Sequence, residues 1–435
     1  MSNNNNSKEK INVLLTGATG YIGSNTLRPL IESGLYNVFV LVRKSSRVPP
    51  IFKTLASHPS MQIITSEFVD LKNQDQKGRI SNLRYIIKSN RIKVIIHCAA
   101  LMEFYPSDNK IVHLSNVVGT ENLLKASFTK DDDESSSDES DSDSDSESDE
   151  EEEEDNRSSS SSSSPSSTSS STSSSRKCLI DRFIYISSTE AMGGVTPTGQ
   201  LRDEKSETHT DYYYGDTKVE AEALVKTYQT RYPTLDCIIL RPTGVYGKDD
   251  DFVIYELMQA VSYGLLFFLP SLAKGAVMFT HIDDVVQGIL LAIKRKKLAT
   301  NTTSTYIICP DKGLEYREVL VFLNEKLNRM KPRLVFPAAI VLPIIDIAGR
   351  FMYLFKKKKF LYKKETLSKM AEDRLFSNEK AKKELGFKPT YSFKQGLNVT
   401  IEEYLENERL SYYPVSPLFI IVALFAMFVK FILWK

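Results

Sequence analysis

The chain has 435 residues, of which 41% are hydrophobic and 26% charged, so it is long and apolar enough for a large buried core. Its net charge of +1 conceals an asymmetry, because residues 131–175 carry 17 of the 55 acidic residues and one basic residue. The remainder is basic, which suits an anionic ligand or a membrane surface. No motif typical of nucleic-acid binding accompanies this charge, so no nucleic-acid partner is expected.

The cysteines and the N-terminus indicate a reducing compartment. The four cysteines are widely spaced and form neither a Cys-x-x-Cys motif nor a Cys–His cluster, so we expect free thiols and no metal site. They are Cys98, Cys178, Cys237 and Cys309. Residues 1–10 are polar and lack the apolar core of a signal peptide, which predicts a disordered tail and a cytosolic catalytic domain.

Residues 13–23, Val-Leu-Leu-Thr-Gly-Ala-Thr-Gly-Tyr-Ile-Gly, predict an apolar strand that runs through a glycine-rich turn into a helix. A helix N-terminus carries unpaired N–H groups and a partial positive charge, so such a turn can hold a pyrophosphate. The alternative is an ordinary strand–turn–helix with glycines by chance. The candidate cofactor-binding residues of the turn are Gly17, Thr19, Gly20, Tyr21, Ile22 and Gly23.

This Gly-x-x-Gly-x-x-Gly spacing resembles the extended short-chain dehydrogenase/reductase family, also called the NAD(P)-dependent epimerase/dehydratase superfamily. In that family Thr-Gly-x-x-Gly-[Tyr/Phe]-[Ile/Leu]-Gly follows the first strand. The resemblance covers residues 11–127 and 179 to about 405. It implies an α/β fold with a Rossmann-type, doubly wound parallel sheet and a smaller C-terminal substrate lobe.

The second predicted strand, residues 37–42, is followed by Arg43 and Lys44. An acidic residue at this place would bind a free ribose 2′-hydroxyl and repel a 2′-phosphate, and none is present here. The sequence therefore favours NADP(H), with NAD(H) as the alternative cofactor. A solvated basic loop is the simpler interpretation of the same residues.

The resemblance also implies contacts with the adenosine end of the cofactor. It places Asp70 where its carboxylate accepts a hydrogen bond from the adenine amine and Leu71 against the ring; an ordinary turn aspartate is the alternative. A later strand ends in Ala99 and Ala100, whose small side chains let the cofactor lie against the backbone. His97 is expected to be structural.

Residues 131–175 interrupt the pattern with alternating Asp and Ser, a run of Glu and a run of Ser. Low hydrophobicity and like-charge repulsion leave nothing to offset the entropy of ordering, so this segment is predicted to be disordered. It falls between a helix and the next strand. In a parallel α/β sheet such loops lie opposite the ligand-binding edge, so we expect it to lie away from the active site.

The predicted catalytic residues follow the insertion. The strand at residues 183–186 leads to Ser188, and Tyr214 and Lys218 are four residues apart on one helix face. A free phenol has a pKa of about 10. The Lys218 cation, together with the positive charge of the oxidised nicotinamide, is expected to lower this pKa so that Tyr214 can exchange a proton with an alcohol. Ser188 would bind the reacting oxygen, with Thr189 as the runner-up. A surface Tyr–Lys pair is the alternative.

Residues 241–247, Arg-Pro-Thr-Gly-Val-Tyr-Gly, match the family's stretch beside the nicotinamide, which adds Pro242 and Gly244 to the candidate cofactor-binding residues. Nucleotide-sugar epimerases usually carry an Arg where this chain has Val277, which argues against a sugar nucleotide. Residues 267–270, Phe-Phe-Leu-Pro, predict either an apolar pocket wall or the end of a buried helix.

Two apolar stretches suggest membrane association. Residues 334–360 contain prolines and charges and predict a lipid-facing, monotopic helix with a basic edge. Residues 414–435 predict a C-terminal transmembrane anchor, with an amphipathic tail or a buried helix as alternatives. We expect a cytosolic catalytic domain anchored to a membrane, with the endoplasmic reticulum as the first choice.

The expected domain organisation follows from these elements. The Rossmann domain comprises residues 11–130 and continues, together with the substrate lobe, over residues 176–333. Residues 361–410 form the closing C-terminal lobe after the membrane-associated segment. Homodimerisation is left open by the sequence.

Within the family, the chain looks most like the 3β-hydroxysteroid dehydrogenase and sterol-4α-carboxylate 3-dehydrogenase branch. The resemblance rests on residues 185–190, Tyr-Ile-Ser-Ser-Thr-Glu, and on the apolar C-terminal half. It implies an oxidoreductase that interconverts a secondary alcohol and a ketone on a sterol-like or other lipophilic substrate. The alternatives are a dihydroflavonol-reductase-like carbonyl reductase, a nucleotide-sugar epimerase or dehydratase, and a membrane-tethered NADP-binding scaffold without turnover.

Overall fold

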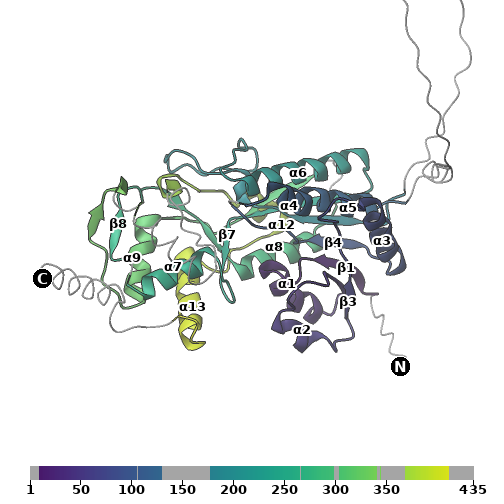
Figure 1. Ribbon diagram of the computed structural model, residues 1–435, viewed down its shortest axis with the longest axis horizontal. Coiled ribbons are helices and arrows are strands. Elements are labelled where there is room, and N and C mark those ends of the chain that lie inside the picture. The colour runs from purple at the N-terminus through teal and green to yellow at the C-terminus, as the bar shows by residue number, and fades with distance from the viewer. Residues whose placement is uncertain are drawn as a thin grey trace, which may run out of the picture.

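The computed structural model describes residues 9–104, 106–129, 177–264, 266–297, 303–339, 343 and 368–410 (Figure 1). Within these ranges, seven parallel strands form one sheet in the order β3-β2-β1-β4-β5-β6-β11. The strands are β1 (Ile11–Thr16), β2 (Tyr36–Val42), β3 (Met61–Thr65), β4 (Val94–His97), β5 (Arg182–Ile186), β6 (Asp236–Pro242) and β11 (Ser304–Ile308). The order reverses at β1, so the predicted Rossmann-type doubly wound sheet is confirmed.

Helices cover both faces of the sheet (Figure 1). One face packs against α1 (Tyr21–Glu32), α2 (Pro50–Leu55), α8 (Ile282–Lys294) and α12 (Glu379–Leu385). The other packs against α3 (Gln76–Ser89), α5 (Gly119–Ala126) and α6 (Tyr213–Arg231). Successive strand residues such as Leu14 and Leu15 enter opposite hydrophobic clusters, and both are fully buried. This two-sided burial explains why the strands are continuous aliphatic runs.

A helical segment between β4 and the insertion connects two parts of the fold. A short helix α4 (Asn109–His113) continues through a π-helical turn, η1 (Leu114–Val118), into α5. The side chain of Asn116 in this turn accepts a hydrogen bond from the Leu101 amide (2.7 Å) and donates to the hydroxyl of Thr217 (3.0 Å). The turn thereby joins the segment after β4 to the first half of α6.

A separate hydrophobic cluster forms the core of the smaller C-terminal lobe. Its helices are α7 (Val253–Ser262), α9 (Tyr316–Lys326) and α13 (Phe393–Glu406), and its short strands are β7 (Gly244–Tyr246), β8 (Phe268–Pro270), β9 (Ala276–Val277), β10 (Phe279–His281), β12 (Leu314–Glu315) and β13 (Leu334–Phe336). The Tyr404 hydroxyl donates to the Gly247 carbonyl at 2.7 Å and thereby fixes α13 to the segment after β7. This lobe lies beside the carboxyl ends of the strands of the large sheet (Figure 1).

The structure corrects two expectations for the C-terminal half. Phe268–Pro270 is not the end of a helix but the strand β8, which pairs in parallel with β13. Because Leu334–Phe336 is this paired strand, the predicted lipid-facing helix does not begin at residue 334. Residues 344–367, 411–435 and 131–175 lie outside the described residues, and with them the predicted anchor and acidic insertion. Among the helices that the structure describes, none combines the length and apolarity required to cross a bilayer.

The chain enters and leaves the insertion at one place. The Thr129 amide donates to the Lys177 carbonyl at 3.0 Å, and the Lys177 amide donates to the Thr129 hydroxyl at 3.0 Å. Phe128 and Cys178 form an antiparallel bridge beside them. These contacts precede the start of β5, at the end of that strand opposite Ser188.

Deleting residues 131–175 is expected to leave turnover within about two-fold of wild type, because the flanking residues already pair and a surface loop of any length costs little. Steady-state kinetics of the purified deletion variant, with its thermal unfolding as the control for folding, checks this. A soluble, folded variant without turnover would contradict the placement of the insertion away from the site.

Candidate active site

The glycine-rich turn between β1 and α1 is built for close approach. Gly17 has φ +70°, and a Cβ there would lie 2.4 Å from the Ala99 amide nitrogen. A Cβ on Gly23 would lie 2.3 Å from the Gly17 carbonyl oxygen. The turn therefore packs directly on the end of β4, and α1 packs on the turn. Gly20 is the N-cap residue of α1 and has no side chain that could bond the first N–H groups of the helix. The first turn of α1 also carries no acidic residue. These features fit the pyrophosphate of a dinucleotide.

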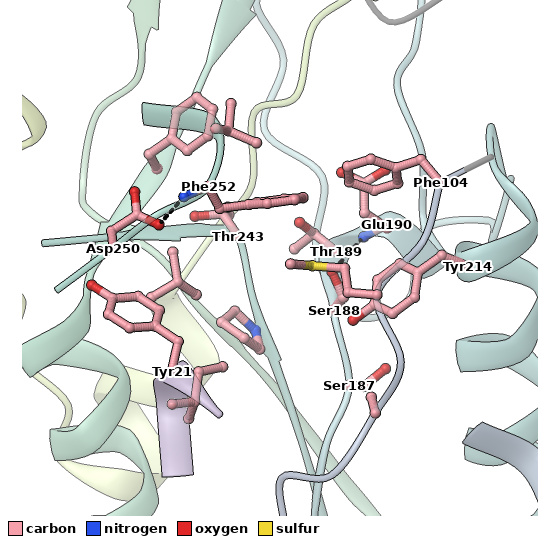
Figure 2. A pocket seen from close by; sticks show the side chains of 18 of the residues that line it. Tyr21, Phe104, Ser187, Ser188, Thr189, Glu190, Tyr214, Thr243, Asp250 and Phe252 are labelled. Atoms are coloured by element: carbon pink, nitrogen blue, oxygen red, sulfur yellow. Dashed lines mark hydrogen bonds between the residues drawn. The ribbon is translucent and has the colours of Figure 1, made fainter. Parts of the chain in front are cut away.

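A cavity of about 310 Å³ extends from this turn toward the smaller lobe (Figure 2). It lies at the carboxyl ends of β1, β4, β5 and β6. Ten predicted site residues line it: Gly17, Gly20, Tyr21, Ile22, Gly23, Ala100, Ser188, Tyr214, Pro242 and Gly244. The rest of its wall is largely apolar and includes Met102, Phe104, Phe252, Val253, Met278, Phe279, Tyr316 and Phe376.

A second cavity, of about 280 Å³, runs from the same turn over the end of β2. Four residues line both cavities: Gly17, Gly20, Cys98 and Ala100. The predicted residues Thr19, Arg43, Leu71 and Ala99 also line the second cavity, and its described lining contains no acidic side chain. The two adjacent cavities, which share these lining residues, fit an extended dinucleotide with its adenosine at Arg43 and Leu71.

Two predicted cofactor residues lie outside both cavities. Lys44 is exposed. The carboxylate of Asp70 accepts hydrogen bonds from the amides of Lys72 (2.9 Å), Gln74 (3.0 Å) and Asp75 (2.9 Å), and these hold the pKa of that carboxyl below its usual value. Asp70 closes its own loop, which agrees with the alternative of a turn aspartate.

His97 has a structural position. Its two ring nitrogens bond the hydroxyls of Thr16 (2.7 Å) and Thr120 (3.0 Å). Complete burial lowers the pKa of His97 to about 3, and the charge of Lys218 acts in the same direction. The imidazole is therefore neutral and serves to join β1, β4 and α5.

The structure brings Ser188, Tyr214 and Lys218 together at the end of β5. The Ser188 hydroxyl accepts the Glu190 amide at 3.1 Å, and Tyr214 lies in the first turn of α6; both face the first cavity (Figure 2). Lys218 is 2% exposed and its Nζ donates to the Ile186 carbonyl at 2.8 Å. The same Nζ lies 5.6 Å from the Tyr214 ring centroid. Lys218 thus supports the site from beneath Tyr214, outside the cavity lining.

The electrostatics differ from the expectation that Lys218 lowers the pKa of Tyr214. Burial raises the pKa of the Tyr214 hydroxyl, and the negative charge of Glu190 raises it further. Burial also lowers the pKa of Lys218 to about 8, although Cys98 and Glu222 oppose this. The protein alone therefore holds Tyr214 as the neutral phenol, because burial disfavours the charged tyrosinate.

A buried carboxylate that was not among the predicted site residues, that of Glu222, fixes the position of α6 relative to the ends of β5 and β6. Glu222, one helical turn after Lys218, accepts the Ser187 hydroxyl at 2.6 Å. It also accepts two hydrogen bonds from the Arg241 guanidinium at 2.7 and 2.5 Å. The contacts bind α6 to the ends of β5 and β6. Its four-residue spacing from Lys218 was the available signal.

A second charged group reaches the site from far along the chain. Arg374 lines the first cavity and binds both carboxylate oxygens of Glu190 at 3.1 Å. The same guanidinium binds Asp211 at 2.5 Å, and Lys369 binds Asp211 at 2.6 Å. Arg374 lies in no motif, so no sequence signal indicated that it reaches the loop after Ser188.

The fold and the glycine turn are those of a Rossmann-type, dinucleotide-binding protein, and Ser188, Tyr214 and Lys218 lie together at the end of β5. The model of the "NAD dependent epimerase/dehydratase family" matches residues 13–308, more than half of the chain, and the chain belongs to that family. The prediction of an enzyme in the NAD(P)-dependent dehydrogenase and reductase class, acting on CH–OH groups, is confirmed.

Relatives place the chain near steroid enzymes. It is 26% identical to a 3β-hydroxysteroid-dehydrogenase/decarboxylase of Arabidopsis thaliana over 52% of this chain and 53% of the relative, about half of that protein's length. It is 22% identical to a 3β-hydroxysteroid dehydrogenase/Δ5→4-isomerase of Mycobacterium tuberculosis over 91% and 92% of the two chains. Among solved structures, UDP-glucuronic acid 4-epimerase from Bacillus cereus in complex with NAD shares the fold, with a TM-score of 0.58 and 17% identity over 91% of this chain and 99% of that one.

Glu190→Gln is expected to move the acidic limb of the pH–rate profile for alcohol oxidation to lower pH. Removing the anion that disfavours tyrosinate lowers the pKa of Tyr214, because the charge of Glu190 adds to the effect of burial. The measurement is kcat/KM against pH. The matched control, Glu207→Gln, changes an exposed acid outside the cavity lining and should not shift the profile. An alkaline shift for Glu190→Gln would contradict the assignment.

Proposed function

We propose that this protein interconverts a secondary alcohol and a ketone on a sterol-like or other lipophilic substrate with a nicotinamide dinucleotide. The observation that carries the proposal is the largely apolar wall of the cavity into which Ser188 and Tyr214 project (Figure 2). Burying a rigid hydrocarbon against such a wall is favourable at ~25 cal/mol per Å² of apolar surface. The names of the two steroid relatives support the same substrate class.

Each polar group of the site has a distinct task in this reaction. The Ser188 hydroxyl donates a hydrogen bond to the reacting oxygen and orients it. Tyr214 takes the hydroxyl proton during oxidation and returns it during reduction. Lys218 supplies positive charge beneath the Tyr214 ring and is held there by the Ile186 carbonyl. A bound nicotinamide supplies the hydride acceptor or donor. Because burial raises the pKa of Tyr214, the oxidative direction is favoured at alkaline pH.

Anionic sugar nucleotides are a poorer fit to this cavity. Val277 stands where related epimerases carry an Arg, and it is buried. Arg374 forms an isolated parallel β-bridge with Val277 and lines the cavity. Its positive charge is balanced by the carboxylates of Glu190 and Asp211. A diphosphate would also meet the acidic lining residues Asp250 and Asp251.

The remaining alternatives share parts of the site. A dihydroflavonol-reductase-like enzyme would use the same residues to reduce a ketone, so a substrate panel in both directions decides between them. The assembled Ser188, Tyr214 and Lys218 disfavour a scaffold without turnover, because such a protein has no use for a buried lysine beneath a tyrosine.

For the cofactor we propose NADP(H) over NAD(H). Arg43 lines the adenosine end of the second cavity, whose described lining contains no carboxylate to repel a 2′-phosphate. The charge of Arg43 and the lack of a carboxylate in the described lining support this cofactor preference. The test is the ratio of kcat/KM for NADP and NAD in the assay described next.

Tyr214→Phe is expected to lower turnover of a 3β-hydroxysteroid at least about 100-fold while leaving cofactor binding intact, because the ring remains and only the proton acceptor is lost. The assay incubates purified protein with NADP or NAD and a panel of sterols, ketones and sugar nucleotides. Fluorescence titration with NADPH is the control for binding. Turnover of the variant at the wild-type rate would show that Tyr214 is not the acid–base group.

We further propose that residues 414–435 anchor the enzyme to the endoplasmic reticulum membrane with its catalytic domain in the cytosol. Within this segment, residues 417–434 form a nearly continuous apolar run of 18 residues, slightly short of the ~20 that span a bilayer. Lys430 and Lys435 near its end can extend to the membrane surface, and this pattern supports the proposal. The full chain is expected to stay in the membrane fraction after carbonate extraction, and the chain ending at Leu410 is expected to be released. Recovery of the full chain in the soluble fraction would contradict an anchor. Cross-linking of the membrane fraction reports whether the protein is a homodimer.

A further inference from the structure

The wall of the first cavity opposite Tyr214 holds a second group of polar atoms. Figure 2 shows Tyr21 and Asp250 on one side of the cavity and Ser188 and Tyr214 on the other. The Tyr21 hydroxyl is buried and has no hydrogen-bond partner in the described protein. Asp250 is 1% exposed and lines the same cavity. Polar side chains buried in this way need a partner, and the cavity is the direction from which one can come.

The surrounding structure holds Asp250 in place. Its carboxylate accepts the Phe252 amide at 2.9 Å and the Tyr255 amide at 3.4 Å at the start of α7. Its carbonyl accepts the Tyr404 hydroxyl (3.1 Å) and the guanidinium of Arg409 (2.8 Å). Because both the backbone and the side chain of Asp250 are fixed, it presents an acceptor at a defined place.

The charges around these two groups select the chemistry of a ligand. Burial raises the pKa of the Tyr21 hydroxyl, and the negative charges of Asp250, Asp249 and Asp283 raise it further. Such a setting repels an anion, so the hydroxyl does not serve the pyrophosphate that the backbone of the same turn fits. A phenol that donates beside a carboxylate that accepts is matched by a neutral hydroxyl, which can accept from the first and donate to the second.

We propose that Tyr21 and Asp250 form a second polar subsite that binds a hydroxyl group of the substrate, at the end remote from the carbon that reacts at Tyr214. This inference rests on the proposed function and narrows its substrate to a lipophilic molecule with an oxygen at each end. A ribose hydroxyl of the cofactor has the same chemistry, and the experiment separates these two sources.

The test compares two 3β-hydroxysteroids, 5α-androstane-3β,17β-diol and 5α-androstan-3β-ol, which differ only in the remote hydroxyl. For the wild type we expect a KM for the diol about 10-fold lower, the value of one net hydrogen bond. Tyr21→Phe removes one oxygen atom and is expected to bring the two KM values within about two-fold of each other, with the KM for the cofactor unchanged.

Tyr306→Phe is the matched control, since its buried hydroxyl donates to Glu384 at 2.8 Å away from the cavity lining. It should keep the preference for the diol while lowering the midpoint of thermal unfolding. Tyr21→Phe breaks no hydrogen bond within the described protein, so its midpoint should not fall.

The outcomes separate the two proposals. If Tyr21→Phe keeps the preference for the diol, or if the wild type oxidises both steroids without a preference, the inference is wrong and the proposed function stands. If Tyr21→Phe raises the KM for the cofactor with both steroids and leaves their ratio unchanged, the hydroxyl serves the ribose and the substrate subsite is wrong. If the wild type oxidises no lipophilic alcohol, the proposed function fails and the inference fails with it.

Discussion

The geometry of the site depends on the buried ion pair between Glu222 and Arg241. The pair links α6, which carries Tyr214 and Lys218, to the end of β6, and the Ser187 hydroxyl adds the end of β5. Arg241 holds the pKa of Glu222 below its usual value even though burial opposes ionisation. Removing one partner of such a pair leaves an uncompensated buried charge at a cost of ~3–5 kcal/mol, so helix and strands are held in one register.

Above this pair, burial rather than a single neighbour sets the proton affinities. Tyr214 and Lys218 are both desolvated, which favours the neutral phenol and weakens the ammonium. Arg374 balances Glu190, the acid whose charge raises the pKa of Tyr214. Because the Arg374 guanidinium is paired with Glu190, its positive charge does not attract an anionic substrate. Charged side chains and a largely apolar wall therefore coexist in one cavity, because Arg374 is paired with Glu190 and Asp211.

The smaller lobe supplies most of what distinguishes this cavity from a general dinucleotide site. The aromatic side chains of Phe252, Phe279 and Tyr316 come from its elements, and Asp250 caps the start of its first helix. Arg374, from the segment that crosses between the lobes, reaches the loop beside Ser188. The large sheet thus positions the glycine turn and Tyr214, and the smaller lobe supplies the cavity wall opposite them.

The sequence by itself determined the parallel sheet, the glycine turn and the placement of Ser188, Tyr214 and Lys218, because each depends on local spacing and on residues that precede or follow a buried strand. It predicted a lowered pKa for Tyr214, whereas burial within the folded protein raises that pKa. It assigned Asp70 to adenine, whereas the loop's own amides bind that carboxylate. Only the tertiary structure brought Arg374 to Glu190 across 184 positions, because no local pattern encodes a contact at that separation.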